Sequence, residues 1–146
     1  MTAPLISFFV PGVPRAKQSF RVSGRGRGFT PARVKSWQSD VGWAAQLAMR
    51  ARGMVDPIGG NLAVHLTFFL PNARKVDNDN LAKCVQDAMN GIVYEDDQYN
   101  VRLVVDKYIC RAKQGVYVMV TPAGRALEVD EEIVNALAGN TSEPTE

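Results

Sequence analysis

Four aspartates flank one helix-like run in the middle of the sequence. Asp77 and Asp79 stand at its start in "KVDNDNLAK", and Asp96 and Asp97 stand just past its end in "YEDDQ". Carboxylates clustered in this way repel one another unless a positive charge lies between them. Three or four oxygen ligands without histidine or cysteine are typical of Mg²⁺ or Mn²⁺ sites. These residue types therefore predict a divalent metal site.

The spacing of the intervening residues predicts the helix that positions these acids. At about 100° per residue, the charged side chains Asp79, Lys83 and Asp87 share one face. The opposite face is apolar and consists of Leu81, Cys84, Val85, Ala88 and Ile92. Gly91 suits the position just past the end of such a helix. Asp77 would fall among the apolar residues if it were helical, so we expect it to precede the helix in an extended conformation and to point the same way as Asp79.

Two other interpretations compete for the acidic pattern. An Asp–Lys–Asp ladder on a solvated helix face needs no ligand, and charged helix faces are usually of this kind. The concentration of acids, with "EDD" following the buried-looking "GIVY", favours a counter-ion instead. A calcium-binding EF-hand loop requires glycine at its sixth position and glutamate at its twelfth, where this chain has Ala82 and Ala88. The EF-hand interpretation is therefore excluded.

The net charge of +2 hides a strong division along the chain. Residues 1–75 carry eleven Lys and Arg against two acids, a net +9, and residues 76–146 carry six against thirteen, a net −7. This division suggests a polyanion partner for the first half and metal or acid chemistry in the second. The candidate phosphate-binding residues are Arg15, Lys17, Arg21, Arg25, Arg27, Arg33, Lys35, Arg74 and Lys75.

Length and patterning predict a single α/β domain, a mixed β-sheet with helices packed on it, over residues 1–138. A polar tail at 139–146 is expected not to pack. Helices are expected at 32–52 and 127–139 in addition to the central one. Strands are expected at 5–10, 61–70, 101–110 and 115–122, with the last two forming a hairpin.

The remaining composition excludes several classes of protein. No apolar run approaches the roughly 20 residues that span a bilayer. Cys84 and Cys110 form no disulfide framework, which predicts reduced thiols in a cytoplasmic protein. The lone His65 lies in a strand pattern and rules out histidine-based zinc sets.

Three short motifs together resemble the RusA family of Holliday junction resolvases. They read "DNDNLAK", "DAMNG" and "YEDDQ", and the likeness is densest over residues 74–98. Family members continue D-D-x-Q-V after the last aspartates, whereas this chain reads "DDQYNV". With Gln98 one place early, we expect the loop after Asp97 to differ from the family pattern, whereas the acids themselves match it.

The resemblance implies a role for each acid and for one lysine. Asp77, Asp79 and Asp97 match the metal-binding catalytic aspartates, with Asp96 as a further candidate ligand. Lys83 matches the family's essential lysine, and Asp87 occupies a supporting position.

The implied activity is Mg²⁺-dependent endonuclease cleavage of branched DNA, with Mn²⁺ as a possible substitute. The enzyme would resolve four-way junctions by paired, symmetric phosphodiester hydrolysis, and the two-fold symmetry of that substrate implies a homodimer. A bacterial or phage-encoded protein of the cytoplasm is expected. The alternative is a non-catalytic branched-DNA-binding protein with a structural metal site, and the charge division disfavours a purely structural protein.

Overall fold

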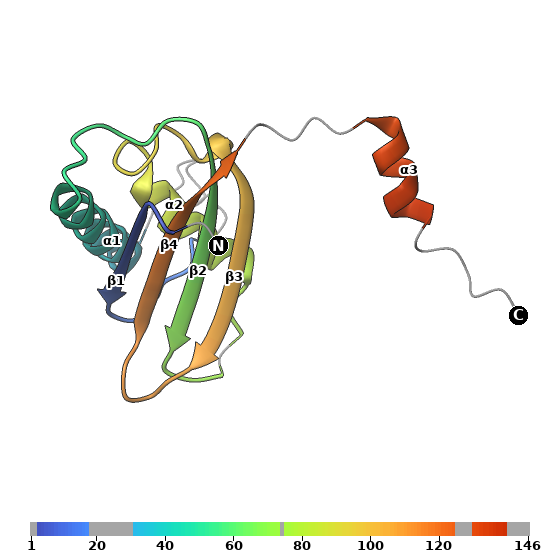
Figure 1. Ribbon diagram of the computed structural model, residues 1–146. Helices are drawn as coiled ribbons and strands as arrows, with labels where there is room; N and C mark the ends of the chain where they lie inside the picture. The colour runs from blue at the N-terminus through green and yellow to red at the C-terminus, as the bar shows by residue number, and fades with distance from the viewer. Residues whose placement is uncertain (1–2, 18–30, 74, 125–129, 140–146) are drawn as a thin grey trace, which may run out of the picture.

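The computed structural model describes residues 3–17, 31–73, 75–124 and 130–139. Four strands form one sheet with the spatial order β1-β4-β2-β3 (Figure 1). Their bounds are β1 Ile6–Pro11, β2 Asn61–Leu70, β3 Asn100–Ile109 and β4 Gly115–Gly124. β4 runs antiparallel to both β1 and β2, whereas β2 and β3 are parallel. The predicted α/β class with a mixed sheet is therefore confirmed.

Helices α1 and α2 cover one face of this sheet (Figure 1). The helices are α1 Ala32–Ala51, α2 Asn78–Met89 and α3 Glu131–Gly139, and a short 3₁₀ turn, η1, spans Asp97–Tyr99. α1 and α3 confirm the helices predicted at 32–52 and 127–139, although Arg52 and Asp130 are not helical and residues 127–129 lie outside the described ranges. α3 buries none of its residues.

The core between the helices and the sheet follows directly from the sequence periodicity. β2 is buried at every second residue, from Leu62 to Leu70, as expected for a strand with one face on the core. α1 buries Val34, Trp37 and Val41 at helical spacing. The spacing of the apolar residues along β2 and along α1 therefore determines which face of each element is buried.

The predicted hairpin between 101–110 and 115–122 is wrong. β3 and β4 lie on opposite edges of β2, so the connection at 110–114 crosses the end of that strand. The N–H of Cys110 donates a 2.8 Å hydrogen bond to the carbonyl of Leu70 at this crossing. The physical reason is that β2 has two hydrogen-bonding edges, and β3 pairs with one while β4 pairs with the other, so β3 and β4 bond to β2 instead of to each other.

Close approach of the backbone explains the glycine that begins β4. A Cβ atom at Gly115 would lie 2.4 Å from the carbonyl oxygen of Val10 and 2.4 Å from Cζ of Phe9. No side chain fits there, because such a contact is far inside van der Waals distance. Gly115 thus allows the chain to turn from the crossing into its place beside β1.

The face of the sheet opposite α1 and α2, here called the open face, carries aromatic side chains. Phe69 stacks on Tyr108 with ring centroids 6.0 Å apart, and Phe9 lies 6.3 Å from Phe69. Tyr117 on β4 is half-exposed on the same face. Among the helices in the described ranges, none is long and apolar enough to cross a membrane.

Candidate functional site

The start of α2 presents the first two aspartates to solvent. Asp77 occupies the N-cap position in an extended conformation (φ −68°, ψ 131°), which agrees with the sequence analysis, and Asp79 lies in the first turn. Both side chains are exposed. Anionic groups at this end of a helix are stabilised by its dipole. Gly91 adopts φ +80° just past the end of α2, also as expected.

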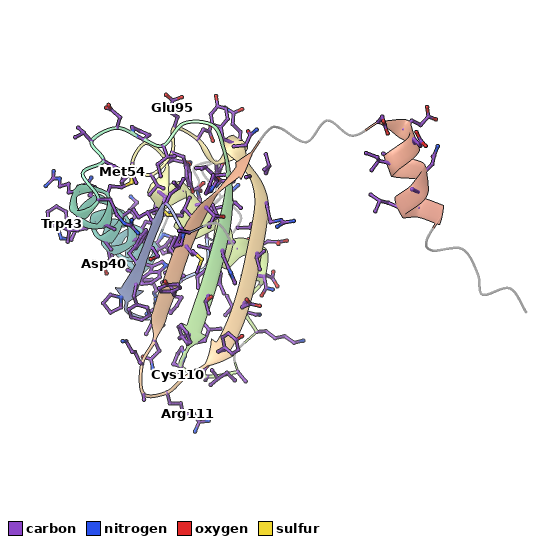
Figure 2. The ribbon with its side chains drawn as sticks, in the orientation of Figure 1. Asp40, Trp43, Met54, Glu95, Cys110 and Arg111 are labelled. Carbon is purple, nitrogen blue, oxygen red and sulfur yellow. The ribbon has the colours of Figure 1, made fainter. Side chains whose placement is uncertain are left out.

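The last two aspartates lie on the loop formed by residues 95–99, here called the acidic loop. Asp96 caps η1, because its Oδ1 accepts a hydrogen bond of 3.3 Å from the N–H of Gln98. Asp97 begins η1. Figure 2 shows Glu95 of this loop at the opposite end of the sheet from Cys110 and Arg111.

The pKa of Asp97 shows which charged groups surround it. Partial burial raises this pKa first, followed by a hydrogen-bonding contact with the carboxyl of Asp96 and by the charges of Asp96 and Asp87. Lys83 acts in the opposite direction and lowers it. Asp87 and Lys83 lie about two turns and one turn beyond Asp79 on α2. The acidic loop therefore returns to α2 beside these residues.

Two hydrogen bonds to Gln86 attach both ends of the acidic loop to α2. The hydroxyl of the fully buried Tyr94 donates to the backbone carbonyl of Gln86 at 3.0 Å. Nδ2 of Asn100 donates to Oε1 of Gln86 at 3.1 Å. Burial, with the nearby charges of Asp97, Asp87 and Asp96 as smaller causes, raises the pKa of Tyr94, so its hydroxyl stays a donor.

The sequence analysis did not single out Gln86 or Asn100. The signal for Asn100 was present in "DDQYNV", where an amide side chain directly precedes Val101. Between Asp97 and Asn100 the chain forms the 3₁₀ turn Asp97–Tyr99, and the amide of Asn100 bonds to Gln86 of α2. No sequence signal marks Gln86, because its importance comes from contacts with residues 8 and 14 positions away.

Lys17 and Asp87 form an ion pair in which Nζ lies 2.7 Å from Oδ2. The N–H of Lys17 also donates to the carbonyl of Asn80 at 3.1 Å. Lys17 was predicted to bind phosphate, and Asp87 to support the acidic site. In the structure each of them has the other as its partner.

A groove of about 720 Å³ begins beside the start of α2 and is called the basic groove here. Three of the predicted phosphate ligands, Arg15, Arg33 and Lys75, line it together with Asp77 and Asn80. Lys35 is exposed on α1 but does not line the groove. The predicted ligands Arg21, Arg25, Arg27 and Arg74 lie outside the described residues.

The acidic side chains fit a hard divalent cation by their chemistry. Their donors are all carboxylate oxygens. Partial burial first, then the contact with Asp96 and the charges of Asp96 and Asp87, raise the pKa of Asp97, and a bound cation would act in the opposite direction. Within the ranges that the structure describes, no three Asp, Glu, His or Cys side chains already converge on one point at ligand distance. Binding a metal would therefore draw exposed carboxylates such as Asp77 and Asp79 towards it.

Known proteins are similar to this chain over most of its length. Residues 11–121 match the family described as Endodeoxyribonuclease RusA. The crossover junction endodeoxyribonuclease RusA of Aquifex aeolicus (strain VF5) is 34% identical over 113 residues, which cover 75% of this chain and 84% of that protein.

A crystal structure of a protein of unknown function from Agrobacterium tumefaciens is also similar, with a TM-score of 0.39 and 12% identity over 71% of this chain and 65% of that one. The family match spans β1's last residue through most of β4, and so includes the basic groove, α2 and the acidic loop. On the family match and the Aquifex relative, this chain belongs to the RusA family of crossover junction endodeoxyribonucleases.

Proposed function

We propose that this protein resolves four-way DNA junctions by Mg²⁺-dependent, paired and symmetric hydrolysis of phosphodiester bonds. One observation carries this proposal. The basic groove, with Arg15, Arg33 and Lys75, opens at the start of the same helix whose flank carries Lys83, Asp87 and the adjoining acidic loop. A phosphate-binding surface and a cluster of carboxylates thus share one rigid element.

The cations of the basic groove would hold the DNA backbone. Arg15 and Arg33 present planar guanidinium groups suited to phosphate oxygens, and Lys75 adds a compact charge. Contacts of this kind position a duplex arm without reading its sequence. The groove therefore supports recognition of branched shape and not of a particular base.

The carboxylates would hold the metal. Asp77, Asp79 and Asp97 are the proposed ligands, with Asp96 as a further candidate. These residues would hold Mg²⁺, which would provide an activated water and neutralise charge on the phosphate and the leaving oxygen. Lys83 lies on the same helix, where its charge lowers the pKa of Asp97. Its ammonium group would either orient the attacking water or meet the negative charge that develops on the phosphate.

The symmetry of a four-way junction supports a homodimer. Two strands must be cut in equivalent positions, and a C2 dimer with one acidic site per subunit meets that requirement. Sedimentation at micromolar concentration is expected to show a dimer. A monomer that still makes symmetric paired cuts would contradict this part of the proposal.

Incubation with a synthetic four-way junction, with and without Mg²⁺, tests the proposed reaction. We expect paired nicks in Mg²⁺, similar cleavage in Mn²⁺ and none in EDTA, with a linear duplex of the same sequence left intact. Binding without nicks under all conditions would instead identify a non-catalytic junction-binding protein.

A further inference from the structure

We propose that Lys17 and Asp87 act together as a positioning pair that fixes the basic half of the chain on the helix of the acidic site. On this proposal, Lys17 does not bind phosphate and Asp87 does not bind metal. The inference rests on the proposed function and deepens it, because it says which contact holds the DNA-binding residues in position relative to the acidic residues.

The geometry of Lys17 connects two parts of the site. Its backbone N–H donates to the carbonyl of Asn80 at 3.1 Å, and its Nζ lies 2.7 Å from Oδ2 of Asp87. Asn80 and Asp87 are about two turns apart on α2, so the lysine side chain runs along the helix. The preceding residues Arg15 and Ala16 line the basic groove. Lys17 is therefore where the groove-forming segment attaches to α2.

Asp87 has one positively charged neighbour and one negatively charged neighbour. It pairs with Lys17 on one side, and its charge acts on Asp97 on the other. Moving Lys17 onto a DNA phosphate would leave Asp87 unpaired beside Asp96 and Asp97, where like charges repel. A metal ion on Oδ2 of Asp87 would compete with Lys17 for that oxygen. Both alternatives therefore disturb the 2.7 Å contact between the two side chains.

The pair is partly buried. Its two side chains are 29% and 23% exposed, so water screens their attraction less than it screens an ion pair on the open surface. Because a small displacement of reacting groups lowers an enzymatic rate strongly, loss of the pair is expected to lower the rate of cleavage in addition to any cost in stability.

A charge-swap experiment tests the pair. The variants are Lys17→Met, Asp87→Asn, the double variant Lys17→Met/Asp87→Asn, and the swap Lys17→Glu/Asp87→Lys. We measure single-turnover cleavage of the junction in Mg²⁺ at saturating protein, and junction affinity in EDTA as a function of salt. Each single variant is expected to cut about 10-fold more slowly with an unchanged salt dependence. The double variant should be no slower than the single variants, and the swap should recover most of the rate.

Control variants and a second measurement separate this inference from its alternatives. Arg52→Met and Asp56→Asn remove exposed charges elsewhere and should keep the parent rate. Hydrogen exchange of the Lys17 amide, which needs no cleavage, should accelerate in the single variants and slow again in the swap.

Each contrary outcome has its own meaning. A lower salt slope for Lys17→Met, additive with Asp87→Asn, would make Lys17 a phosphate ligand. Weaker Mg²⁺ binding by Asp87→Asn, measured by calorimetry and not restored by the swap, would make Asp87 a metal ligand. Parent-like rates in all variants would leave the pair merely structural. A parent protein that never cleaves would overturn the proposed function alone, and the exchange measurement would still decide whether the pair holds residue 17.

Discussion

The hydroxyl of Tyr94 lies 3.0 Å from the carbonyl oxygen of Gln86 and connects the acidic loop to the last turns of α2. Tyr94 is fully buried, so the hydroxyl group has its partner inside the protein. Removing the hydroxyl leaves the ring packed and the loop less firmly attached. The position of Asp97 beside Asp87 and Lys83 therefore depends on a bond made by a residue three positions earlier.

The first prediction concerns Tyr94→Phe. Loss of one hydrogen bond from a buried group should lower the free energy of unfolding by about 1 kcal/mol, or roughly 3 °C in Tm for a chain of this size. Urea denaturation measures this change. Tyr117→Phe is the matched control. The Tyr117 side chain is half-exposed on the open face, so this change should affect stability little. Equal stability of the two variants would contradict the anchoring role.

A second prediction concerns the proposed metal ligands. Asp97→Asn keeps size and shape but removes a charged ligand, so junction cleavage in Mg²⁺ should fall by at least about 100-fold. Junction affinity in EDTA should match or exceed that of the parent, because repulsion with phosphate is relieved. Asp77→Asn and Asp79→Asn should behave alike and should not add when combined, since groups acting as a unit are not additive.

Asp96→Asn serves as the control within the acidic loop. The amide Oδ1 of Asn can still accept the hydrogen bond from the N–H of Gln98 that caps η1, so this variant removes only the charge, and we expect a milder loss of cleavage than for Asp97→Asn. Parent-like cleavage by the Asp97 variant, in a folded protein, would refute its assignment as a ligand.

A third prediction concerns Lys83. Its charge lowers the pKa of Asp97, so Lys83→Ala should raise that pKa further and shift the acid limb of the pH–rate profile upward. Loss of the ammonium group should also reduce the rate at saturating protein far more than junction affinity. Weak binding with a normal saturated rate would assign Lys83 to DNA binding instead.

The basic groove yields a fourth prediction. Changing Arg15, Arg33 and Lys75 together to Ala should weaken junction binding by an order of magnitude or more and lower the slope of log affinity against log salt by about two to three. The same test with Arg21, Arg25 and Arg27 examines the arginine-rich segment predicted from the sequence. Whichever set leaves the salt slope unchanged does not bind phosphate.

The two thiols give a fifth prediction. Burial raises the pKa of Cys84 to about 11, with the charge of Asp87 adding to the effect. Because only the thiolate reacts, Cys84 should resist a thiol reagent at pH 8 until the protein unfolds. The half-buried Cys110 should react in the native state, at the end of the sheet away from Glu95 (Figure 2). Counting labelled thiols before and after adding denaturant checks this, and rapid native labelling of Cys84 would contradict the packing of α2.

The sequence was sufficient to predict elements whose signal is local. The alternation in "NLAVHLTFFL" predicted β2 with its bounds, and the wheel positions of Asp79, Lys83 and Asp87 predicted a charged face on α2. Asp77 was expected outside the helix because its wheel position clashed with the apolar face. These inferences depend on neighbours within a few residues, which periodicity reports well.

Long-range pairing could not be predicted in the same way. The hairpin interpretation failed because β2, about 40 residues earlier, takes the place between β3 and β4. Lys17 looked like one cation among many, since its partner Asp87 lies 70 residues away. Nothing in a local pattern distinguishes a lysine that binds phosphate from one that binds a carboxylate.

The strand order has a consequence for synthesis of the chain. β4 lies between β1 and β2 in the sheet, yet it is the last of the four described strands to leave the ribosome. Until β4 emerges, β1 lacks the strand that pairs with it among the described residues, and one edge of β2 stays open. Unpaired edges of this kind attract other chains. An mRNA truncated before the codons of β4 would therefore encode every proposed metal ligand, yet its product would be inactive and prone to aggregate. The nuclease is complete only when β4, which carries none of these ligands, has joined the sheet.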